Sequence, residues 1–258
     1  MRLVTYDAGD GPRAGVLLDG EVAPVGASVR ELLVSGSDIR PGDKRIPLDG
    51  VRLLAPVPDP QKIVCLGLNY RDHAAEAGQD IPANPLWFAK FANSLIGDGE
   101  PIVLPAAHPD YVDYEAELAV VIGRDGQVAG AMPFNDVSAR DLQLQNPLWI
   151  SGKAVDTFAP CGPALVLSDE IDDLQALALR TRVNGEVVQE GTTAEMIFGV
   201  AETVAWLSRT MTLLPGDIIA TGTPAGIGAS KGLFLRDGDT VSVEIDGLGA
   251  VTNPVRAA

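Results

Sequence analysis

The segment VDYEAELAVVIG, residues 112–123, places acidic side chains in a stretch that otherwise has the pattern of a buried β-strand. Val and Ile favour strands, and side chains along a strand alternate between its two faces. One predicted face is apolar throughout, and the other begins with Asp113, Glu115 and Glu117. Because like charges repel and unpaired buried charges are costly, this arrangement needs a physical explanation.

Two explanations fit the segment by itself. The acids can lie on an exposed face where each pairs with an Arg or Lys, since exposed charged faces are common. Alternatively they can gather around a hard divalent cation, which requires several carboxylate oxygens in one place. Both explanations stay open until other segments are considered.

The segment FNDVSARD, residues 134–141, supplies a further carboxylate. Asp136 lies two residues before Ser138, which with Asp141 has the spacing of a capping box that opens a short helix. A carboxylate beside such a turn can reach a metal, although a plain turn aspartate has the same pattern. Arg140 lies one turn further, where its guanidinium can pair with a carboxylate of the protein or of a substrate.

The segment NYRDHAAEAG, residues 69–78, contains one of the two histidines. His73 and Glu76 are three residues apart, so they share one face of a predicted helix. A carboxylate beside an imidazole orients it and raises its basicity, as a general base requires. A surface ion pair with no catalytic role has the same spacing.

Two glycine-containing segments add polar candidates. Lys153, in SGKAVDTFAPCGP, can face a cleft or be an ordinary solvated lysine. The segment GTPAGIG, residues 222–228, follows a predicted strand but lacks the Lys-Ser/Thr of a phosphate-binding loop. Its backbone N–H groups are predicted to receive a substrate carboxylate, with the Thr223 hydroxyl as a further donor.

The elements that must position these residues are mostly strands. Residues 1–54 are predicted to form a small β-rich module, residues 55–60 a stiff linker, and residues 61–258 the main domain. Helices are predicted at residues 28–36, 71–78 and 192–209, the last opened by a capping box of Thr192 and Glu195. The fold class is α+β, with a mixed, mainly antiparallel, curled sheet. The predicted strands of the main domain are residues 62–67, 86–91, 101–104, 115–123, 163–167, 217–222, 232–235 and 240–245, together with a hairpin at 180–189 that turns at Asn184-Gly185.

Composition limits the classes of partner. The chain has 258 residues and a formal net charge of −16, which argues against nucleic acid or an anionic membrane as a partner. An anionic substrate would therefore need a local positive centre. Cys65 and Cys161 form no CxxC pair and are predicted to be reduced thiols. Without an apolar signal segment or a run long enough to span a bilayer, the sequence predicts a cytoplasmic protein.

Taken in order, these segments resemble the fumarylacetoacetate hydrolase family, including its acylpyruvase and 2-hydroxyhepta-2,4-diene-1,7-dioate isomerase-like branch. The resemblance covers residues 61–258. Its motifs are GLNYRDHAAEAG, FAKFANSLIGDGEPIVLP, DYEAELAVVIG, NDVSARDLQ, GKAVDTFAPCGP, RVNGEVVQ and PGDIIATGTPAGIG.

The resemblance implies a mixed β-roll, a homodimer, and a divalent metal, Mg²⁺ or Mn²⁺, held by Glu115, Glu117 and Asp136, with Asp113 outside that set. It implies that His73 and Glu76 form a catalytic dyad on a mobile lid helix, with Lys153 as a further catalytic residue. Arg140, Gln143 and Thr223 match positions that line the substrate site.

The implied activity is metal-dependent hydrolysis of a C–C bond in a small anionic 2-oxo or 1,3-dicarbonyl acid, of acylpyruvate or fumarylacetoacetate type. Decarboxylation of an oxaloacetate-like acid, or isomerisation or hydration of a 2-hydroxy-dienoate, is the alternative at the same site. A metal-binding scaffold without catalysis is a third hypothesis.

Overall fold

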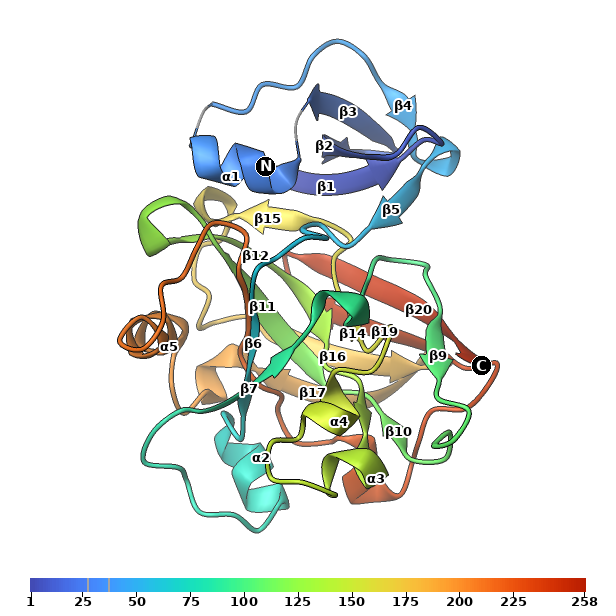
Figure 1. Ribbon diagram of the computed structural model, residues 1–258, viewed down its shortest axis with the longest axis vertical. Coiled ribbons are helices and arrows are strands. Elements are labelled where there is room, and N and C mark those ends of the chain that lie inside the picture. The colour runs from blue at the N-terminus through green and yellow to red at the C-terminus, as the bar shows by residue number, and fades with distance from the viewer. Residues whose placement is uncertain (27, 37) are drawn as a thin grey trace.

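The computed structural model describes residues 1–26, 28–36 and 38–258. Among these residues, eleven strands form one large sheet in the order β4-β3-β2-β1-β15-β12-β11-β18-β6-β7, with β5 also paired to β1 (Figure 1). Its strands are β1 (Arg2–Asp7), β2 (Pro12–Leu18), β3 (Glu21–Gly26), β4 (Ile46–Pro47), β5 (Arg52–Leu54), β6 (Ile63–Gly67), β7 (Leu86–Lys90), β11 (Ala116–Ile122), β12 (Val128–Asn135), β15 (Leu165–Leu167) and β18 (Ile218–Ala220).

A second sheet of five strands has the order β17-β16-β19-β20-β9. Its strands are β9 (Ile102–Leu104), β16 (Ala178–Val183), β17 (Glu186–Thr192), β19 (Thr240–Ile245) and β20 (Gly249–Ala257). Two short pairs complete the strands: β10 (Val112–Asp113) with β13 (Ser138–Ala139), and β8 (Leu95–Ile96) with β14 (Ala159–Pro160). Most pairs are antiparallel, so the predicted mixed, strand-rich α+β fold is confirmed.

The helices are short, and α2, α3 and α4 gather at one end of the molecule (Figure 1). They are α1 (Val29–Ser35), α2 (Arg71–Glu76), α3 (Arg140–Gln143), α4 (Ile150–Lys153), α5 (Val200–Leu207) and α6 (Gly228–Lys231). Single 3-10 turns occupy η1 (Leu48–Gly50), η2 (Ala92–Ser94), η3 (Arg124–Gly126), η4 (Ser168–Glu170) and η5 (Thr193–Glu195).

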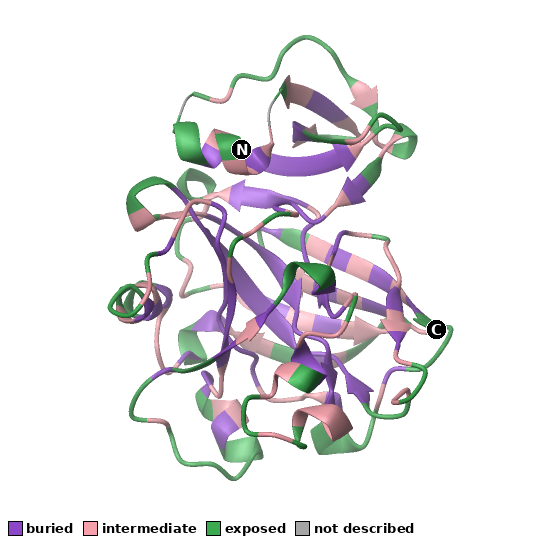
Figure 2. Ribbon diagram, viewed as in Figure 1, coloured by how far each residue is buried: buried purple, intermediate pink, exposed green. Residues whose placement is uncertain are grey.

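Strand β11 lies at the centre of the core and is buried on both faces (Figure 2). Leu118 and Val120 pack in the cluster that contains Val243 of the second sheet. Ala119 and Val121 point the other way and pack in a separate cluster. The predicted alternation is therefore correct, and both faces of the strand lie inside the protein.

The N-terminal strands continue the large sheet. Strand β1 pairs with β15 in the register Arg2 to Val166 and Leu3 to Leu165. Val57, in the predicted linker, is fully buried. The division at residues 54 and 61 stays a prediction, because the backbone pairing runs across it.

Several local predictions are confirmed. The β16–β17 hairpin turns at Asn184-Gly185, where both residues have positive φ, as a type I′ turn requires. The predicted helix at residues 28–36 is present as α1, and the structure adds a capping box of Ser28 and Glu31 at its start. Cys65 and Cys161 are free and buried.

The predicted helix at residues 192–209 is wrong over its first half. Thr192 caps only the 3-10 turn η5, and α5 starts at Val200. The intervening backbone bonds to Asn69 instead: the N–H groups of Ile197 and Phe198 donate to its main-chain and side-chain oxygens at 2.7 and 2.9 Å. Because this partner is remote in sequence, no local pattern signals the interruption.

Two smaller predictions are also corrected. Residues 232–235 form no strand. The Leu233 N–H instead donates to the Gly228 carbonyl and closes the turn after α6. Ser138 and Asp141 form no capping box, because α3 begins without a side-chain cap and the Ser138 hydroxyl donates to the Asp136 carbonyl.

No helix in residues 1–26, 28–36 and 38–258 is long and apolar enough to cross a membrane. Edge strand β7 carries the exposed side chains Leu86 and Trp87, followed by exposed Phe91. An apolar edge of this kind is compatible with pairing to another subunit. The homodimer stays a prediction.

Leu118 provides a test of the core. Its side chain has no exposure, so Leu118→Ala should lower the free energy of unfolding by about 2–5 kcal/mol through lost burial and a residual cavity. The matched control is Leu144→Ala, at a side chain that is 81% exposed, and its effect should stay within about 0.5 kcal/mol. Urea denaturation measures both, and equal effects would contradict the central position of β11.

Candidate active site

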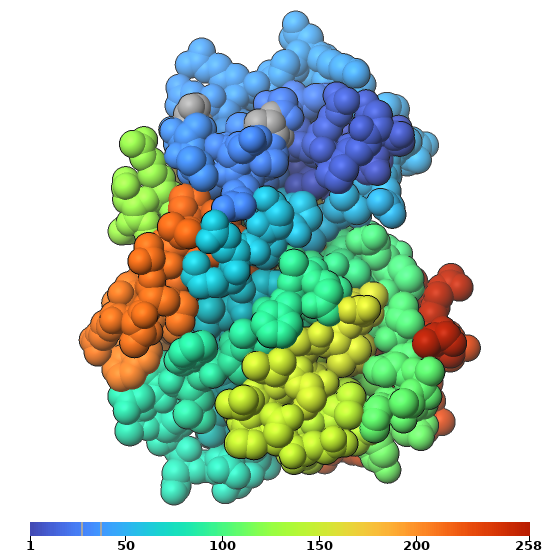
Figure 3. All heavy atoms as spheres, viewed as in Figure 1, coloured from blue at the N-terminus to red at the C-terminus, as the bar shows by residue number. Residues whose placement is uncertain are grey.

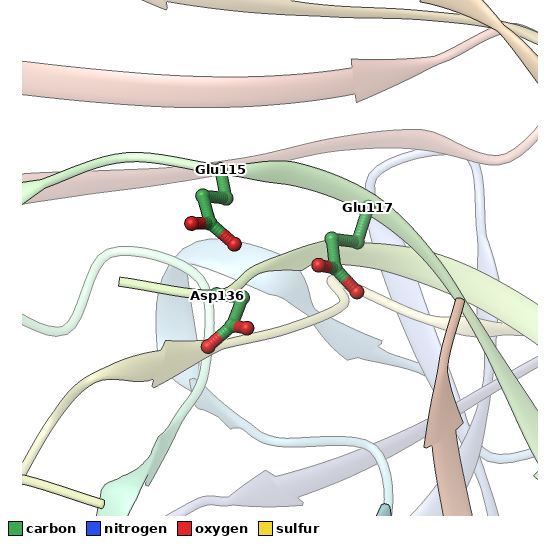
Figure 4. A group of neighbouring side chains, drawn as sticks. All are labelled: Glu115, Glu117 and Asp136. Atoms are coloured by element: carbon green, nitrogen blue, oxygen red, sulfur yellow. The ribbon is translucent and has the colours of Figure 1, made fainter. Parts of the chain in front are cut away.

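Glu115, Glu117 and Asp136 converge at one point (Figure 4). Strands β11 and β12 pair in antiparallel register with Ala116 opposite Asn135 and Glu117 opposite Phe134. This register brings Asp136, directly after β12, beside Glu115, whose carbonyl accepts from the Asp136 N–H at 3.0 Å. One carboxylate oxygen from each of the three residues lies within 4.8 Å of the others.

Cationic side chains surround two of these carboxylates. The Lys153 ammonium donates to Glu115 Oε2 at 2.8 Å and to Asp136 Oδ2 at 2.7 Å. Lys90, at the end of β7, donates to Asp136 Oδ1 at 2.6 Å, and Arg140 pairs with Glu115 Oε1 at 2.6 Å. The hypothesis of an exposed acidic face is wrong, because Glu115 and Glu117 are buried, although Glu115 does pair with Arg140 and Lys153.

Glu117 differs from the other two. Its Oε2 accepts from the Gly222 N–H at 2.9 Å, whereas its Oε1 is buried and has no hydrogen-bond partner among the described residues. Burial, together with the nearby charges of Asp136 and Glu115, raises the pKa of Glu117 well above its usual value. Burial alone would also raise the pKa of Glu115. The positive charges of Lys153 and Arg140 outweigh burial and lower this pKa below its usual value.

These residues fit a divalent cation. Carboxylate oxygens are the ligands that Mg²⁺ and Mn²⁺ prefer. A cation at the triad would supply the missing partner of Glu117 Oε1 and reduce the repulsion that raises the pKa of this residue. The structure therefore contains a buried acidic triad that can hold a metal ion.

Asp113 lies outside the triad and has a different set of partners. It belongs to β10, which pairs with β13 rather than continuing β11, so the acidic segment is two strands and not one. Its carboxylate accepts from Arg140 Nε and Nη2 at 2.8 and 2.6 Å, and from the N–H groups of Gly228 and Ala229 at 2.7 and 2.9 Å. Arg140 thus links Asp113 to Glu115, and its guanidinium binds protein carboxylates.

His73 and Glu76 lie together on α2, as predicted. His73 Nδ1 lies 3.2 Å from Glu76 Oε2. Burial alone would raise the pKa of Glu76, but hydrogen bonds from Ser230, Gly226 and His73 lower it below its usual value. An ionised carboxylate only accepts hydrogen bonds, so Nδ1 carries the imidazole proton and Nε2 is left as the basic atom.

A cavity of about 310 Å³ brings the predicted site residues together. Segments around α2 and around α3 and α4 adjoin on the same face of the molecule (Figure 3). The lining contains both polar and apolar side chains, and the Lys153 ammonium lies 5.0 Å from the centroid of the Phe88 ring. The polar lining is His73, Glu115, Gln143, Lys153 and Thr223, and the apolar lining includes Leu66, Leu68, Leu86, Phe88 and Trp149.

The remaining predicted residues lie directly behind this lining. Glu117 and Asp136 are fully buried, and Arg140 contacts both Glu115 and Gln143. Thr223 lines the cavity, but its hydroxyl donates to the Ala116 carbonyl and accepts from Gln189, each within 2.8 Å. The hydroxyl therefore holds the start of β11 in place.

The glycine-rich segment has different ligands from those predicted. We define the glycine loop as residues 222–230. Its N–H groups bind carboxylates of the protein: Gly222 donates to Glu117, Gly226 to Glu76, and Gly228 to Asp113. These three donors are therefore engaged by protein carboxylates, and binding of a substrate carboxylate by the rest of the loop stays a prediction.

Sequence analysis missed Lys90 and Gln189. Lys90 is buried in a predicted strand, LWFAKF, and the same conflict that marked the acids marks this lysine. Gln189 accepts from the Ala116 N–H at 3.0 Å and donates to Thr223 and Pro224, so it joins β17 to β11 and the glycine loop. Nothing in its local sequence distinguishes it.

Comparison with known proteins gives the family. The pattern of the fumarylacetoacetate (FAA) hydrolase C-terminal family matches residues 62–256, and that of the Rv2993c-like N-terminal family matches residues 1–56. The chain belongs to the fumarylacetoacetate hydrolase family. The resemblance found in the sequence is thereby confirmed, and members of this family are enzymes.

Individual relatives carry different activities in their names. Oxaloacetate tautomerase fahd2, a mitochondrial protein of Xenopus laevis, is 40% identical over 99% of this chain and 90% of its own length. Fumarylacetoacetate hydrolase of Exiguobacterium antarcticum has a TM-score of 0.89 and 35% identity, with both chains fully covered. A 2-hydroxyhepta-2,4-diene-1,7-dioate isomerase of Mycobacterium marinum has a TM-score of 0.85 and 38% identity, over 100% of this chain and 98% of its own.

Glu117→Gln tests the triad through stability. Because the folded state raises the pKa of Glu117, metal-free wild type should lose stability as pH rises from the ordinary carboxyl pKa towards that raised value. Glutamine does not titrate, so the metal-free variant should be more stable than wild type at neutral pH.

Added Mg²⁺ should stabilise the wild type more than the Glu117→Gln variant. At one hundred times its dissociation constant it should stabilise wild type by about 2.7 kcal/mol, and the variant by much less. The exposed Glu202→Gln is the control and should behave as wild type. Thermal and urea denaturation with EDTA or Mg²⁺ measure this, and equal stabilisation of both proteins would contradict a metal site at Glu117.

Proposed function

We propose that this protein is a divalent-metal-dependent enzyme that interconverts the keto and enol forms of a small 2-oxo carboxylic acid of the oxaloacetate type. The observation that carries the proposal is one cavity that joins an oriented imidazole, His73, to a buried acidic triad and the Lys153 ammonium. The tautomerase named among the relatives, aligned over nearly the whole chain, supports this chemistry.

Glu115, Glu117 and Asp136 would hold Mg²⁺ or Mn²⁺, which supplies Lewis acidity at the oxygens of a 2-oxo acid. His73 Nε2, with Nδ1–H donated to Glu76, accepts the proton from the carbon next to the carbonyl. The C–H electron pair becomes the C=C bond, and the C=O π pair moves to the carbonyl oxygen. That oxygen takes a proton from solvent, and protonated His73 releases its proton to solvent, so the number of protons is conserved. In the reverse direction His73 returns the proton to carbon.

Lys153 and Gln143 act on the same substrate from the cavity wall. The positive charge of Lys153 stabilises the oxygen on which negative charge develops, in a site largely shielded from water. Gln143 accepts from Arg140 through Oε1, so its amide NH₂ remains available for a substrate oxygen. Arg140 contributes by holding Glu115 and Gln143 in position.

Hydrolysis of a C–C bond in an acylpyruvate or fumarylacetoacetate-type acid, the leading hypothesis from the sequence, is the second candidate. It is supported by the cavity of about 310 Å³, whose lining includes the apolar side chains Leu66, Phe88 and Trp149 and can accept a larger group than a four-carbon acid carries. His73 would then activate water instead of removing a proton from carbon. Decarboxylation and diene isomerisation also proceed through an enolate and share the same residues.

Location and assembly belong to the same proposal. The cytoplasmic location and the homodimer rest on the sequence, whereas the relative from Xenopus laevis is named a mitochondrial protein. A small anionic 2-oxo acid is the proposed partner.

His73→Ala tests the proposed base. Enolisation of oxaloacetate, followed by ultraviolet absorbance of the enol, should lose about 10²–10⁴-fold in kcat, the usual contribution of a positioned base. Mg²⁺ affinity measured by calorimetry should be unchanged, because His73 is not among the triad ligands. His108→Ala, at the other histidine, should retain wild-type activity.

The same variants distinguish the two candidate reactions. Pyruvate release from acylpyruvates reports hydrolysis, and pyruvate formation from oxaloacetate reports decarboxylation. Full wild-type enolisation in excess EDTA, or in His73→Ala, would show that the proposed function is wrong. Loss of Mg²⁺ binding in His73→Ala would make His73 a ligand and not the base.

A further inference from the structure

The carboxylate of Glu76 is held from two sides. Its Oε2 faces His73 Nδ1, at 3.2 Å, within the same helix. Its Oε1 accepts from the Gly226 N–H at 3.0 Å and from the Ser230 hydroxyl at 2.7 Å. Both of these donors belong to the glycine loop, about 150 residues further along the chain.

This division of the two oxygens determines how His73 is presented. A glutamate side chain has several rotamers, and an unrestrained carboxylate at the end of a short helix would also turn to solvent. With Oε1 fixed by two donors, Oε2 stays directed at His73 Nδ1. That contact selects the imidazole tautomer whose Nε2 is unprotonated, on a residue that lines the cavity.

Helix α2 has few other restraints of its own. It has only six residues and begins without a side-chain cap, and isolated helices of this length are marginal in water. Tyr70 and Ala74 are buried beneath it, whereas residues 75–80 are exposed. The contact of Glu76 with the glycine loop therefore restrains the end of α2 that carries the dyad.

The Ser230 hydroxyl has a second acceptor within reach. The Ile227 carbonyl lies 2.8 Å away, and one hydroxyl proton cannot serve both acceptors at once. The bond to the ionised carboxylate is the stronger of the two because it is charge-assisted. If α2 moves away, the hydroxyl can turn to Ile227 and stay satisfied, so release of Glu76 leaves no unpaired donor.

We propose that Ser230 is a positioning residue that, with the Gly226 N–H, fixes the Glu76 carboxylate and through it the tautomer and direction of His73. The Ser230 hydroxyl bonds to Glu76 and Ile227, neither of which belongs to the acidic triad, and Ser230 is not among the residues that line the cavity. Its effect on turnover rests on the proposed function, in which His73 is the base, but its effect on the His73 tautomer does not.

The tautomer can be measured directly, because the chain contains only two histidines. In ¹⁵N-histidine-labelled protein at about pH 9, where an ordinary imidazole is neutral, wild-type His73 should carry its proton on Nδ1. His108 pairs through Nδ1 with Asp141 at 2.6 Å, away from the glycine loop, and serves as an internal reference.

Ser230→Ala should shift His73 towards the Nε2–H tautomer that predominates in free histidine, with His108 unchanged. Ser230→Thr retains the hydroxyl and should restore the wild-type spectrum. Ser208→Ala, which removes a hydroxyl bonded within α5, is the matched control and should have no effect. If the His73 tautomer is unchanged in Ser230→Ala, the proposal is overturned.

Kinetics with oxaloacetate and acylpyruvates add a second readout. Ser230→Ala should lower kcat on the order of 10-fold, as expected for loss of one charge-assisted hydrogen bond, with KM and Mg²⁺ affinity unchanged. If Ser230→Ala lowers the Mg²⁺ affinity as much as it lowers kcat, the variant has damaged the whole site, and the positioning role is overturned. If the tautomer shifts but wild type turns over none of these acids, the proposed function fails and the role of Ser230 stands.

Discussion

The burial of three carboxylates at the end of one strand pair is the constraint on which the rest of the site depends. Charges this close cannot all be buried without compensation, because each loses its hydration and repels the others. Lys153, Lys90 and Arg140 neutralise Glu115 and Asp136, while Glu117 is left with one buried oxygen that has no partner. This incomplete compensation creates a position for a divalent cation.

The same compensation positions the surrounding residues. Lys153 bonds two of the three carboxylates and also lines the cavity, so its ammonium is fixed at the cavity wall. Arg140 is held by Asp113, which is held in turn by N–H groups of the glycine loop. Gly228 admits no larger residue there, because a Cβ would lie 2.4 Å from the Asp113 carboxylate. The acidic triad, Lys153, Arg140 and the glycine loop therefore form one connected set of charge-assisted hydrogen bonds.

The site also explains why one family includes names with different reactions. Under the proposed function, a base beside a bound 2-oxo acid generates an enolate, and the subsequent step depends on where the proton or the water is delivered. In this protein the cavity lining combines polar residues with the apolar side chains Leu66, Phe88 and Trp149. Under the proposed function, the size and polarity of the substrate then select the reaction that these residues perform.

The sequence by itself determined the features that arise from neighbouring residues. The alternation in β11, the Asn184-Gly185 hairpin, the predicted helix at residues 28–36 and the His73–Glu76 spacing each depend on contacts a few residues apart, and each is present in the structure. The acidic residues were found because charges in an apolar strand conflict with burial. Their grouping with Asp136 and Lys153 came from the resemblance to a family, not from local pattern.

Only the tertiary structure decided which partners these side chains have. Lys90 reaches Asp136 across 46 residues, Ser230 reaches Glu76 across 154, and Asn69 interrupts the predicted helix at residues 192–209 from 129 positions away. It also separated Asp113 from the acidic strand and gave the N–H groups of the glycine loop to protein carboxylates. Such contacts depend on sheet order and register, which sequence periodicity does not specify, because any strand with the right alternation can pair with several others.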